Sequence, residues 1–366
     1  MSLFDQIAAH EHEQLVFCHD PVSGLRAVIG IHDTTLGPAL GGTRMRVYKD
    51  EQAAITDVLR LSRGMTYKSA VTGLNLGGGK AVIIGDPRRD KCEALFRSYG
   101  RFVESLNGRY TTAEDMGTGV ADMEWVRMET DHVVGISAQL GGSDDPSPVT
   151  AMGTYEGMKA AAMRKYGSES LAGKTIAVQG VGHVGYYLVQ HLAREGAKIL
   201  ISDVNQEALN TCVREFGAEV VGTDEIYDVE MDIYAPCAIG ATVNDETIDR
   251  LKCSIVAGSA NNVLLDEDRH GMRLVERDIL YCPDYVINAG GLINVANELE
   301  GYNQKRALAQ AAAIHDTIRD ILELAAEKGI PPFRAANEIA ERRIRRMGQV
   351  KSTFLGPRER RYRGIC

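Results

Sequence analysis

The hydrophobic pattern of the N-terminal half alternates between short β-rich runs and helical segments. Apolar runs separated by Gly, Pro and Asp turns fill residues 15–46 and predict a small sheet. Residues 50–62 carry apolar side chains at nearly helical spacing, and a strand at 80–85 and a helix from about 91 to 106 follow. This order of elements predicts an α/β domain.

The C-terminal half repeats an alternation of strand and helix. A helix is expected from near Thr150 to Tyr166, where Gly167 ends it, and the preceding loop, Gly141–Pro148, is the expected hinge between two domains. The strands beyond it should form a parallel sheet. They are expected at 175–179, 198–202, 232–234, 253–257 and 285–288, with helices at 186–195 and 303–327.

The 366-residue chain is long enough for two domains that each bury a core. We place the first at 1–148, rejoined by 331–366 after Pro331-Pro332, and the second at 149–330. Apolar residues make up 44% of the chain and charged residues 25%, a globular composition rather than a disordered or membrane one. No apolar run approaches the ~20 residues that span a bilayer, and the N-terminus lacks signal-peptide features, so we expect a cytoplasmic protein without a membrane partner.

Charge and cysteine usage argue against nucleic-acid and metal binding. The net charge is -9, which disfavours a nucleic-acid partner. The Arg-rich stretches at 341–346 and 358–363 are interpreted as a helix face and tail at a subunit contact. The cysteines are odd in number, without a C-x-x-C pair or a Cys/His cluster, and are interpreted as reduced thiols. They are Cys18, Cys92, Cys212, Cys237, Cys253, Cys282 and Cys366.

A glycine-rich motif, Gly180-Val181-Gly182-His183-Val184-Gly185, lies between an expected strand and helix. The first glycine permits a tight turn, the second lets the backbone approach a pyrophosphate, and the third lets helix and strand pack closely. Asp203 follows about 20 residues on, where a carboxylate can bond a ribose 2'-hydroxyl. Residues 204–206 supply no cation for a 2'-phosphate, so NAD is favoured over NADP. A nucleotide-free turn with a surface aspartate is the alternative.

Two lysines, Lys68 and Lys80, are flanked by small or apolar residues rather than by other charges. An isolated lysine is normally solvated. Lys80, however, follows Gly77–Gly79, and consecutive glycines indicate close approach of a ligand or another backbone. The spacing does not fit a Walker A loop, because Gly73 to Gly79 is one residue too long and Ala81 replaces the Ser or Thr that would hold magnesium. Asp115, read alone, is explained equally well as a helix cap or turn residue.

Taken together, these segments resemble the leucine/phenylalanine/valine dehydrogenases within the wider glutamate dehydrogenase superfamily, with the leucine-specific members most similar. The resemblance covers nearly the whole chain. The matching segments are Leu36–Arg44, Gly64–Ala70, Leu76–Pro87, Thr111–Gly117, Asp145–Thr150, Gly180–Gly185, Ala257–Asn262 and Val286–Glu298.

The resemblance implies reversible oxidative deamination of an L-amino acid to a 2-oxo acid, ammonium and NADH. Lys68 would hold the substrate carboxylate, Lys80 would activate water and polarise the carbonyl, and Asp115 would exchange protons with the amine. For that task the pKa of Lys80 has to fall through desolvation and repulsion from a neighbouring cation. Lys68 should stay charged.

Further positions follow from the same resemblance. Thr150 and Asn262 would help to place substrate and nicotinamide, and Gly41, Gly42 and Gly291 would offer backbone close to the ligand. Met65 is expected at the substrate, and Ala238 and Asn288 at the cofactor, together with the glycine motif and Asp203. The first domain would then bind substrate and mediate assembly, the second would be a Rossmann-like NAD domain, and the active site would lie between them.

The side-chain pocket is expected to be apolar. In glutamate-specific relatives a lysine and a serine receive the distal carboxylate, and the matching positions here are Leu40 and Val295. An unpaired carboxylate there would cost several kcal/mol, which disfavours glutamate. With Ala113 and Leu292 the pocket suits leucine, isoleucine or valine; since one methylene changes selectivity by only ~1 to 3 kcal/mol, phenylalanine stays open. The alternative is that these four are merely core residues.

Two wider questions stay open at this level. A catalytically silent NAD-binding regulatory protein is possible on the same fold, although the joint presence of Lys68, Lys80 and Asp115 argues against it. Relatives form symmetric assemblies, often octamers, so the resemblance implies a homo-oligomer.

Overall fold

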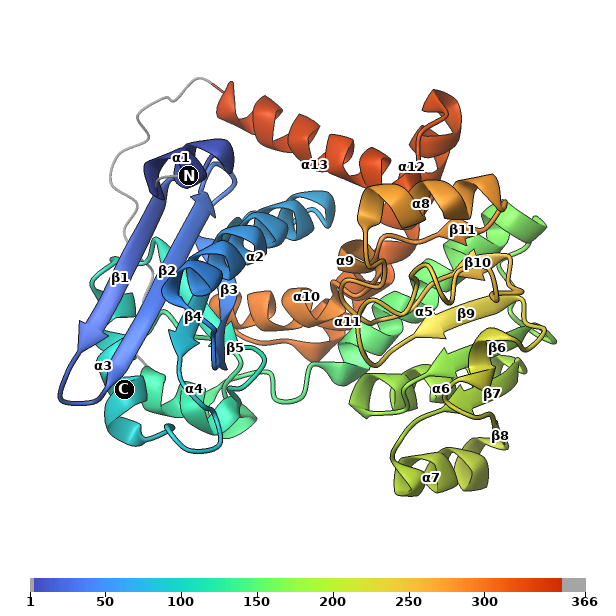
Figure 1. The fold of residues 1–366 in the computed structure, drawn as a ribbon, viewed down its shortest axis with the longest axis horizontal. Helices are drawn as coiled ribbons and strands as arrows, with labels where there is room; N and C mark the ends of the chain where they lie inside the picture. The colour runs from blue at the N-terminus through green and yellow to red at the C-terminus, as the bar shows by residue number, and fades with distance from the viewer. Residues whose placement is uncertain (1–2, 351–366) are drawn as a thin grey trace.

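Two separate β-sheets organise the chain, one in each half (Figure 1). The computed structural model describes residues 3–350. The Arg-rich segment at 358–363 and Cys366 lie outside the described residues. Within the described part, no helix is both long enough and apolar enough to cross a membrane.

The first sheet is mixed, with strand order β1-β2-β4-β3-β5. The β1/β2 and β2/β4 pairs are antiparallel, whereas β3 runs parallel to both β4 and β5. The strands are β1 (Gln14–Asp20), β2 (Leu25–Asp33), β3 (Ala39–Arg46), β4 (Gly77–Ile84) and β5 (Tyr110–Glu114). The helices of this half are α1 (Leu3–Ala9), α2 (Glu51–Val71), α3 (Glu93–Glu104) and α4 (Val120–Arg127).

Alternation along β2 and β4 assigns the two faces of this sheet. Val28 and Val82 pack against Ala54 and Val58 of α2 on one face. The neighbouring positions Ile29, Ile31, Ala81 and Ile83 join a larger core with α3 and α4 on the other face. Because successive side chains of a strand point to opposite sides, both faces of the sheet are buried.

Helix α2 is longer than the sequence pattern predicted, and the glycine run lies inside a strand. We expected a helix at 50–62; α2 continues to Val71, since neither a proline nor a capping glycine stops it. The strand expected at 80–85 begins at Gly77. A side chain at Gly78 would lie 2.5 Å from the Ser62 carbonyl oxygen and overlap the Thr66 backbone. At this position it is therefore another backbone that approaches closely.

The second sheet is entirely parallel, with strand order β8-β7-β6-β9-β10-β11. This is the doubly wound order of a dinucleotide-binding fold, and it confirms the predicted α/β class with a Rossmann-like half. The strands are β6 (Thr175–Gln179), β7 (Lys198–Ser202), β8 (Glu219–Val220), β9 (Ile233–Pro236), β10 (Ile255–Val256) and β11 (Leu280–Tyr281).

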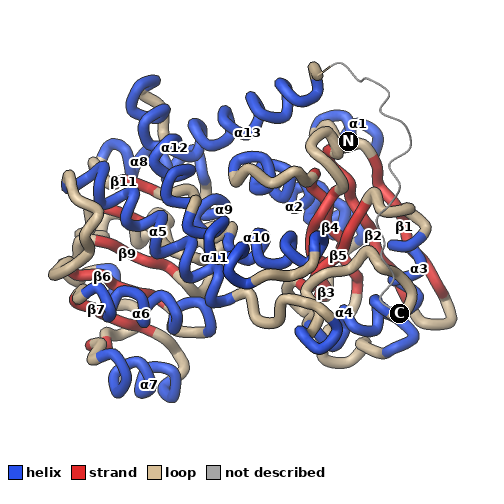
Figure 2. Tube along the Cα trace, turned by 180° about the vertical axis from the view of Figure 1, so that it is seen from behind, coloured by secondary structure: helices blue, strands red, loops and turns tan. Residues whose placement is uncertain are grey.

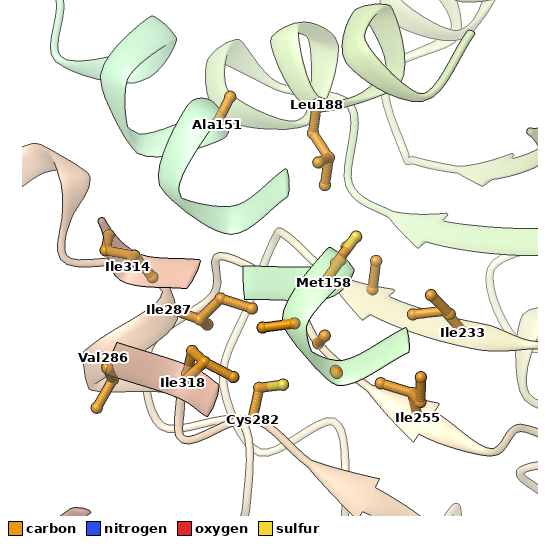
Figure 3. Close-up of a cluster of buried hydrophobic side chains, with 14 of the residues drawn as sticks. Ala151, Met158, Leu188, Ile233, Ile255, Cys282, Val286, Ile287, Ile314 and Ile318 are labelled. Atoms are coloured by element: carbon orange, nitrogen blue, oxygen red, sulfur yellow. The ribbon is translucent and has the colours of Figure 1, made fainter. Parts of the chain in front are cut away.

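Helices α5 and α6 lie in front of the parallel sheet in the view from behind (Figure 2). Alternate residues of β6, β9 and β10 enter two different core clusters, so both faces of the sheet are buried. Figure 3 shows part of one cluster, where Met158 lies between Leu188 and the sheet residues Ile233 and Ile255. The helices are α5 (Ser147–Tyr166), α6 (His183–Glu195), α7 (Gln206–Phe216), α8 (Glu267–Glu276), α9 (Asp284–Ile287), α10 (Gly290–Ala296), α11 (Gln304–Ala312), α12 (Ile314–Lys328) and α13 (Pro332–Gly348). Short 3-10 turns occur at Ala138–Leu140, Glu225–Tyr227 and Asn297–Glu300.

Three predictions for this half were wrong in detail. The strand expected at 285–288 is helix α9, because a short apolar run can be buried equally well in either conformation. The helix expected at 303–327 is divided into α11 and α12 at Ala313, since α11 packs in a small cluster with Val149 while α12 enters the main core. Helix α5 begins at Ser147, three residues earlier than expected.

Helix α13 leaves the half of the chain that contains the parallel sheet and crosses back toward α2 (Figure 1). Its first turn is fixed to α8: a side chain at Gly271 would lie 2.6 Å from the Phe333 ring, and Arg334 pairs with Asp268 at 2.7 Å. Its later part reaches α2 through Glu341 and Arg343. Of the arginines at 341–346, Arg343 makes contacts within the chain, and the subunit contact expected for this stretch stays a prediction.

We expect Gly78→Ala to destabilise the protein, because the added methyl would force α2 away from β4. The expected loss is about 2 kcal/mol of unfolding free energy. Gly64→Ala is the matched control: Gly64 lies in α2 with open space beside its Cα, so alanine should stabilise the helix by about 0.5 to 1 kcal/mol. Urea unfolding followed by circular dichroism measures both. Equal midpoints would contradict the close packing.

Candidate active site

Lys80 and Asp115 come from neighbouring parts of the first sheet and form a partly buried ion pair. Lys80 lies on β4 and is only 6% exposed; Asp115 directly follows β5. Lys80 Nζ is 3.2 Å from Asp115 Oδ1. Strand β3 lies between β4 and β5, and a side chain at its Gly42 would lie 2.9 Å from Asp115 Cβ. Glycine at position 42 therefore leaves room for Asp115.

Arg44, on β3, shares Asp115 with Lys80. Its Nε donates to Asp115 Oδ2 at 2.8 Å, and its Nη1 lies 3.3 Å from Asp57 Oδ2 on α2. Tyr48 donates to the same Asp57 oxygen at 2.8 Å. The two carboxylates and two cations alternate, so each charge has a partner of opposite sign.

This arrangement lowers the pKa of both Lys80 and Asp115. Burial lowers the pKa of Lys80; the Asp115 carboxylate opposes that shift, and the Arg44 cation adds to it. Burial alone would raise the pKa of Asp115, but Lys80 and Arg44 outweigh it, so the pKa lies below its usual range. The pair thus combines an ionised carboxylate with an amine that loses its proton more readily than a solvated lysine.

Lys68 lies on the last turn of α2 and contacts Asn288 in the half of the chain that contains the parallel sheet. Its Nζ donates to Asn288 Oδ1 at 2.7 Å, and Asn288 Nδ2 in turn donates to Asn261 Oδ1 at 2.7 Å. Burial lowers the pKa of Lys68 to about 8, with the opposing influence of Asp284 and a further lowering by Lys80. A value near 8 leaves this lysine mostly cationic at neutral pH.

The residues expected to form the side-chain pocket belong to one apolar cluster. Leu40, Ala113 and Leu292 are buried in it, and Met65 and Val295 pack against it. Four residues that the sequence did not single out complete the cluster: Leu74, Leu76, Val134 and Ala296. The cluster contains residues from both halves of the chain, since Leu292 and Val295 come from α10.

The glycine motif has the geometry of a phosphate-binding turn. Gly180 has φ +100, and a side chain there would meet Ala238 Cβ at 2.6 Å; one at Gly185 would overlap the Gly180 carbonyl. Gly182 caps the N-terminus of α6 and has open space beside its Cα. Backbone N–H groups at such a helix start can hold phosphate oxygens.

Asp203 lies at the end of β7, beside this turn. Its Oδ2 accepts from Val181 N at 2.7 Å and its Oδ1 accepts from Asn205 N at 2.8 Å. The remaining lone pairs of the carboxylate can accept from a ribose diol. His183 and Val184 form the first helical positions of α6, with His183 exposed. These residues fit a dinucleotide with an unphosphorylated ribose.

The remaining expected positions are Thr150 with Gly291, Asn262, and Gly41, which lie at three places. Thr150 and Gly291 are adjacent: a side chain at Gly291 would lie 3.1 Å from Thr150 Oγ1. Asn262 lies in the loop after β10 with φ 53, a left-handed conformation that is uncommon for a residue with a side chain. Gly41 is close-packed, since a side chain there would approach Met65 Cγ at 3.3 Å and overlap the Gly79 carbonyl.

Comparison with known proteins identifies the family. Residues 12–132 match the family described as Glu/Leu/Phe/Val dehydrogenase, dimerisation domain, and residues 141–211 and 201–350 match Glutamate/Leucine/Phenylalanine/Valine dehydrogenase. The chain belongs to the glutamate/leucine/phenylalanine/valine dehydrogenase family. This amino-acid dehydrogenase is 59% identical to the leucine dehydrogenase of Thermoactinomyces intermedius over 97% of both chains. It is 48% identical to the phenylalanine dehydrogenase of Caldalkalibacillus thermarum, over 96% of this chain and 95% of that one.

A solved structure agrees with this assignment. The dehydrogenase superposes on the L-tryptophan dehydrogenase of Nostoc punctiforme with a TM-score of 0.86 at 46% identity, over 94% of this chain and 99% of that one. The resemblance drawn from the sequence motifs is confirmed.

The sequence motifs did not single out Arg44 and Asp57, which lie beside the Lys80 and Asp115 pair, or Leu74, Leu76 and Val134 of the apolar cluster. Arg44 could have been predicted, because it lies two positions after Gly42 on a strand and so faces the same side of the sheet. No sequence pattern indicated Asp57 or Val134, since only the packing of α2 and of the loop after α4 brings them to this region.

We expect Arg44→Gln to raise the pKa of Lys80, because a neighbouring cation is removed. With Lys80 as the expected proton acceptor, the acidic limb of the kcat/KM profile for deamination would move to higher pH by about one unit. Arg60→Gln is the control, since Arg60 lies 4.0 Å from Asp57 but its side chain is 68% exposed. An unshifted limb in Arg44→Gln would contradict the electrostatic coupling.

Proposed function

We propose that this dehydrogenase catalyses the reversible NAD-dependent oxidative deamination of branched-chain L-amino acids, with L-leucine preferred over isoleucine and valine. The observation that carries the proposal is the apolar cluster of Leu40, Ala113 and Leu292. Leu40 and Ala113 come from the half that holds the Lys80 and Asp115 pair, and Leu292 comes from α10 of the other half. The high identity to a leucine dehydrogenase supports it.

Each polar residue has a distinct task in this proposal. Lys68 would bind the substrate carboxylate as a point charge. Lys80 would take a proton from the water that attacks the substrate carbon, for which a lowered pKa suits it. Asp115, kept ionised by its two cations, would accept a proton from the substrate ammonium group. Buried placement of Lys80 would also exclude other water from the reaction.

The cofactor proposal rests on the glycine motif and Asp203. NAD, when bound, supplies the acceptor for the hydride that leaves the α-carbon. Gly180, Gly182 and Gly185 would hold its pyrophosphate, and Asp203 would accept from its adenosine ribose. Thr150, Asn262, Ala238 and Asn288 are proposed beside the nicotinamide half. Asn288 would have a second task, because it also accepts from Lys68.

The proposals for oligomeric state and cellular location rest on the family match and on the sequence. The description of the family matched by residues 12–132 as a dimerisation domain supports a homo-oligomer, and we propose an octamer on resemblance. Light scattering of the purified protein tests the octamer. The cytoplasmic location stays a prediction from sequence.

We expect Lys80→Ala to lose nearly all turnover while the thermal unfolding temperature stays close to that of the wild type. A panel of L-amino acids with NAD, followed by NADH absorbance, is the measurement. The wild type should turn over L-leucine fastest. Preference for L-glutamate or NADP would overturn the assignments of Leu40 and Asp203, and NAD binding without any turnover would indicate a regulatory protein instead.

We expect Leu40→Lys to raise the ratio of kcat/KM for L-glutamate over L-leucine, because a cation would enter a cluster where Leu40 is 0% exposed. A pair between lysine and the distal carboxylate replaces an unpaired buried charge, so the ratio should rise at least about tenfold. Leu40→Met keeps the position apolar and should leave the ratio near that of the wild type. A ratio unchanged by lysine would place Leu40 outside the pocket.

A further inference from the structure

Arg343 of α13 forms a set of hydrogen bonds with the end of α2. Its Nη1 donates to the carbonyl oxygens of Leu74 at 2.7 Å, Ala70 at 3.0 Å and Ser69 at 3.3 Å. Its Nη2 donates to the carbonyl oxygen of Gly73 at 3.0 Å and to Asn75 Oδ1 at 2.9 Å. The last carbonyl groups of a helix carry its negative dipole end, so a cation is favourable there.

A second contact joins the same two helices one turn away. Tyr67 donates to Glu341 Oε1 at 2.9 Å, and Arg63 donates to Tyr67 at 2.9 Å while its guanidinium lies 4.5 Å from the ring centre. Tyr67 directly precedes Lys68. Helix α13 therefore touches α2 on both sides of this lysine in sequence.

The segment that Arg343 holds carries two parts of the proposed substrate site. Lys68 lies on the last turn of α2, and its Nζ reaches Asn288. Leu74 and Leu76, in the loop that follows, belong to the apolar cluster around Leu40. The carbonyl oxygen of Leu74 is the acceptor nearest to Arg343. One guanidinium thus bonds the backbone directly after Lys68 and the backbone of Leu74 in the apolar cluster.

We infer that Arg343 is a positioning residue for substrate selection. By holding residues 69–75 it determines the positions of Lys68 and of Leu74 and Leu76. These positions in turn determine the affinity for the substrate carboxylate and the discrimination between substrate side chains. The inference rests on the proposed function of Lys68 and the cluster. A planar guanidinium can reach several carbonyl groups at once, which a lysine ammonium cannot do in the same geometry. Lys80 lies on β4, outside the clamped segment.

The experiment compares Arg343→Ala and Arg343→Lys with Arg342→Ala, a control at the next, exposed position of α13. In Arg343→Ala we expect KM for L-leucine to rise about tenfold, since small displacements of a positioning group are costly, with kcat changed less than about threefold. The preference for L-leucine over L-phenylalanine should shrink, and KM for NAD should stay near the wild-type value. Arg343→Lys should recover part of the loss, and Arg342→Ala should match the wild type.

A purely structural role predicts a different result. Loss of folded enzyme would lower the rate with every substrate equally and leave KM and the substrate ratio unchanged; that outcome overturns the inference. Hydrogen exchange of the amides at 72–76 gives a readout without turnover: faster exchange in Arg343→Ala supports the clamp, and unchanged exchange overturns it. Failure of the proposed function would instead appear in the wild type, as no turnover of L-leucine.

Discussion

The direct contact between helix α2 and the glycines of strand β4 is the constraint on which the active site depends. Because Gly78 has no side chain, α2 rests on the strand at Ser62 and Thr66. The lysine of the strand and the lysine of the helix, Lys80 and Lys68, then share one region, and the charge of Lys80 adds to the lowering of the pKa of Lys68. A helix held farther away by ordinary side chains would separate the two.

Bringing two lysines into a buried region has an electrostatic cost, which the surrounding carboxylates offset. Asp115 accepts from Arg44 and pairs with Lys80, and Asp57 takes the other side of Arg44. Such alternation gives each of these four charges a neighbour of opposite sign, yet it does not cancel the effect of burial on the pKa of Lys80. The amine of Lys80 therefore keeps a lowered pKa, which suits the proton transfer proposed for it.

The link between the two halves is distributed over several elements. Asn288 connects Lys68 to the loop after β10, α10 contributes Leu292 and Val295 to the apolar cluster, and α13 reaches from α8 to the end of α2. Substrate-side residues are therefore held in part by the half that would carry the cofactor. The second half of the chain therefore contacts both Lys68 and the apolar cluster directly.

Local sequence patterns were sufficient to predict the parallel, doubly wound half, whereas the roles assigned to the site residues stay predictions. Strands at 175–179 and 198–202 were found with their observed bounds, because a long parallel sheet needs continuous apolar runs and its glycine turn has a local steric cause. Tertiary structure alone decided the rest. The run at 285–288 became helix α9, α2 extended past residue 62, and Arg44, Asp57, Val134 and Arg343 joined the site or its support. Those outcomes depend on contacts between residues far apart in the chain, and local spacing carries no information about such contacts.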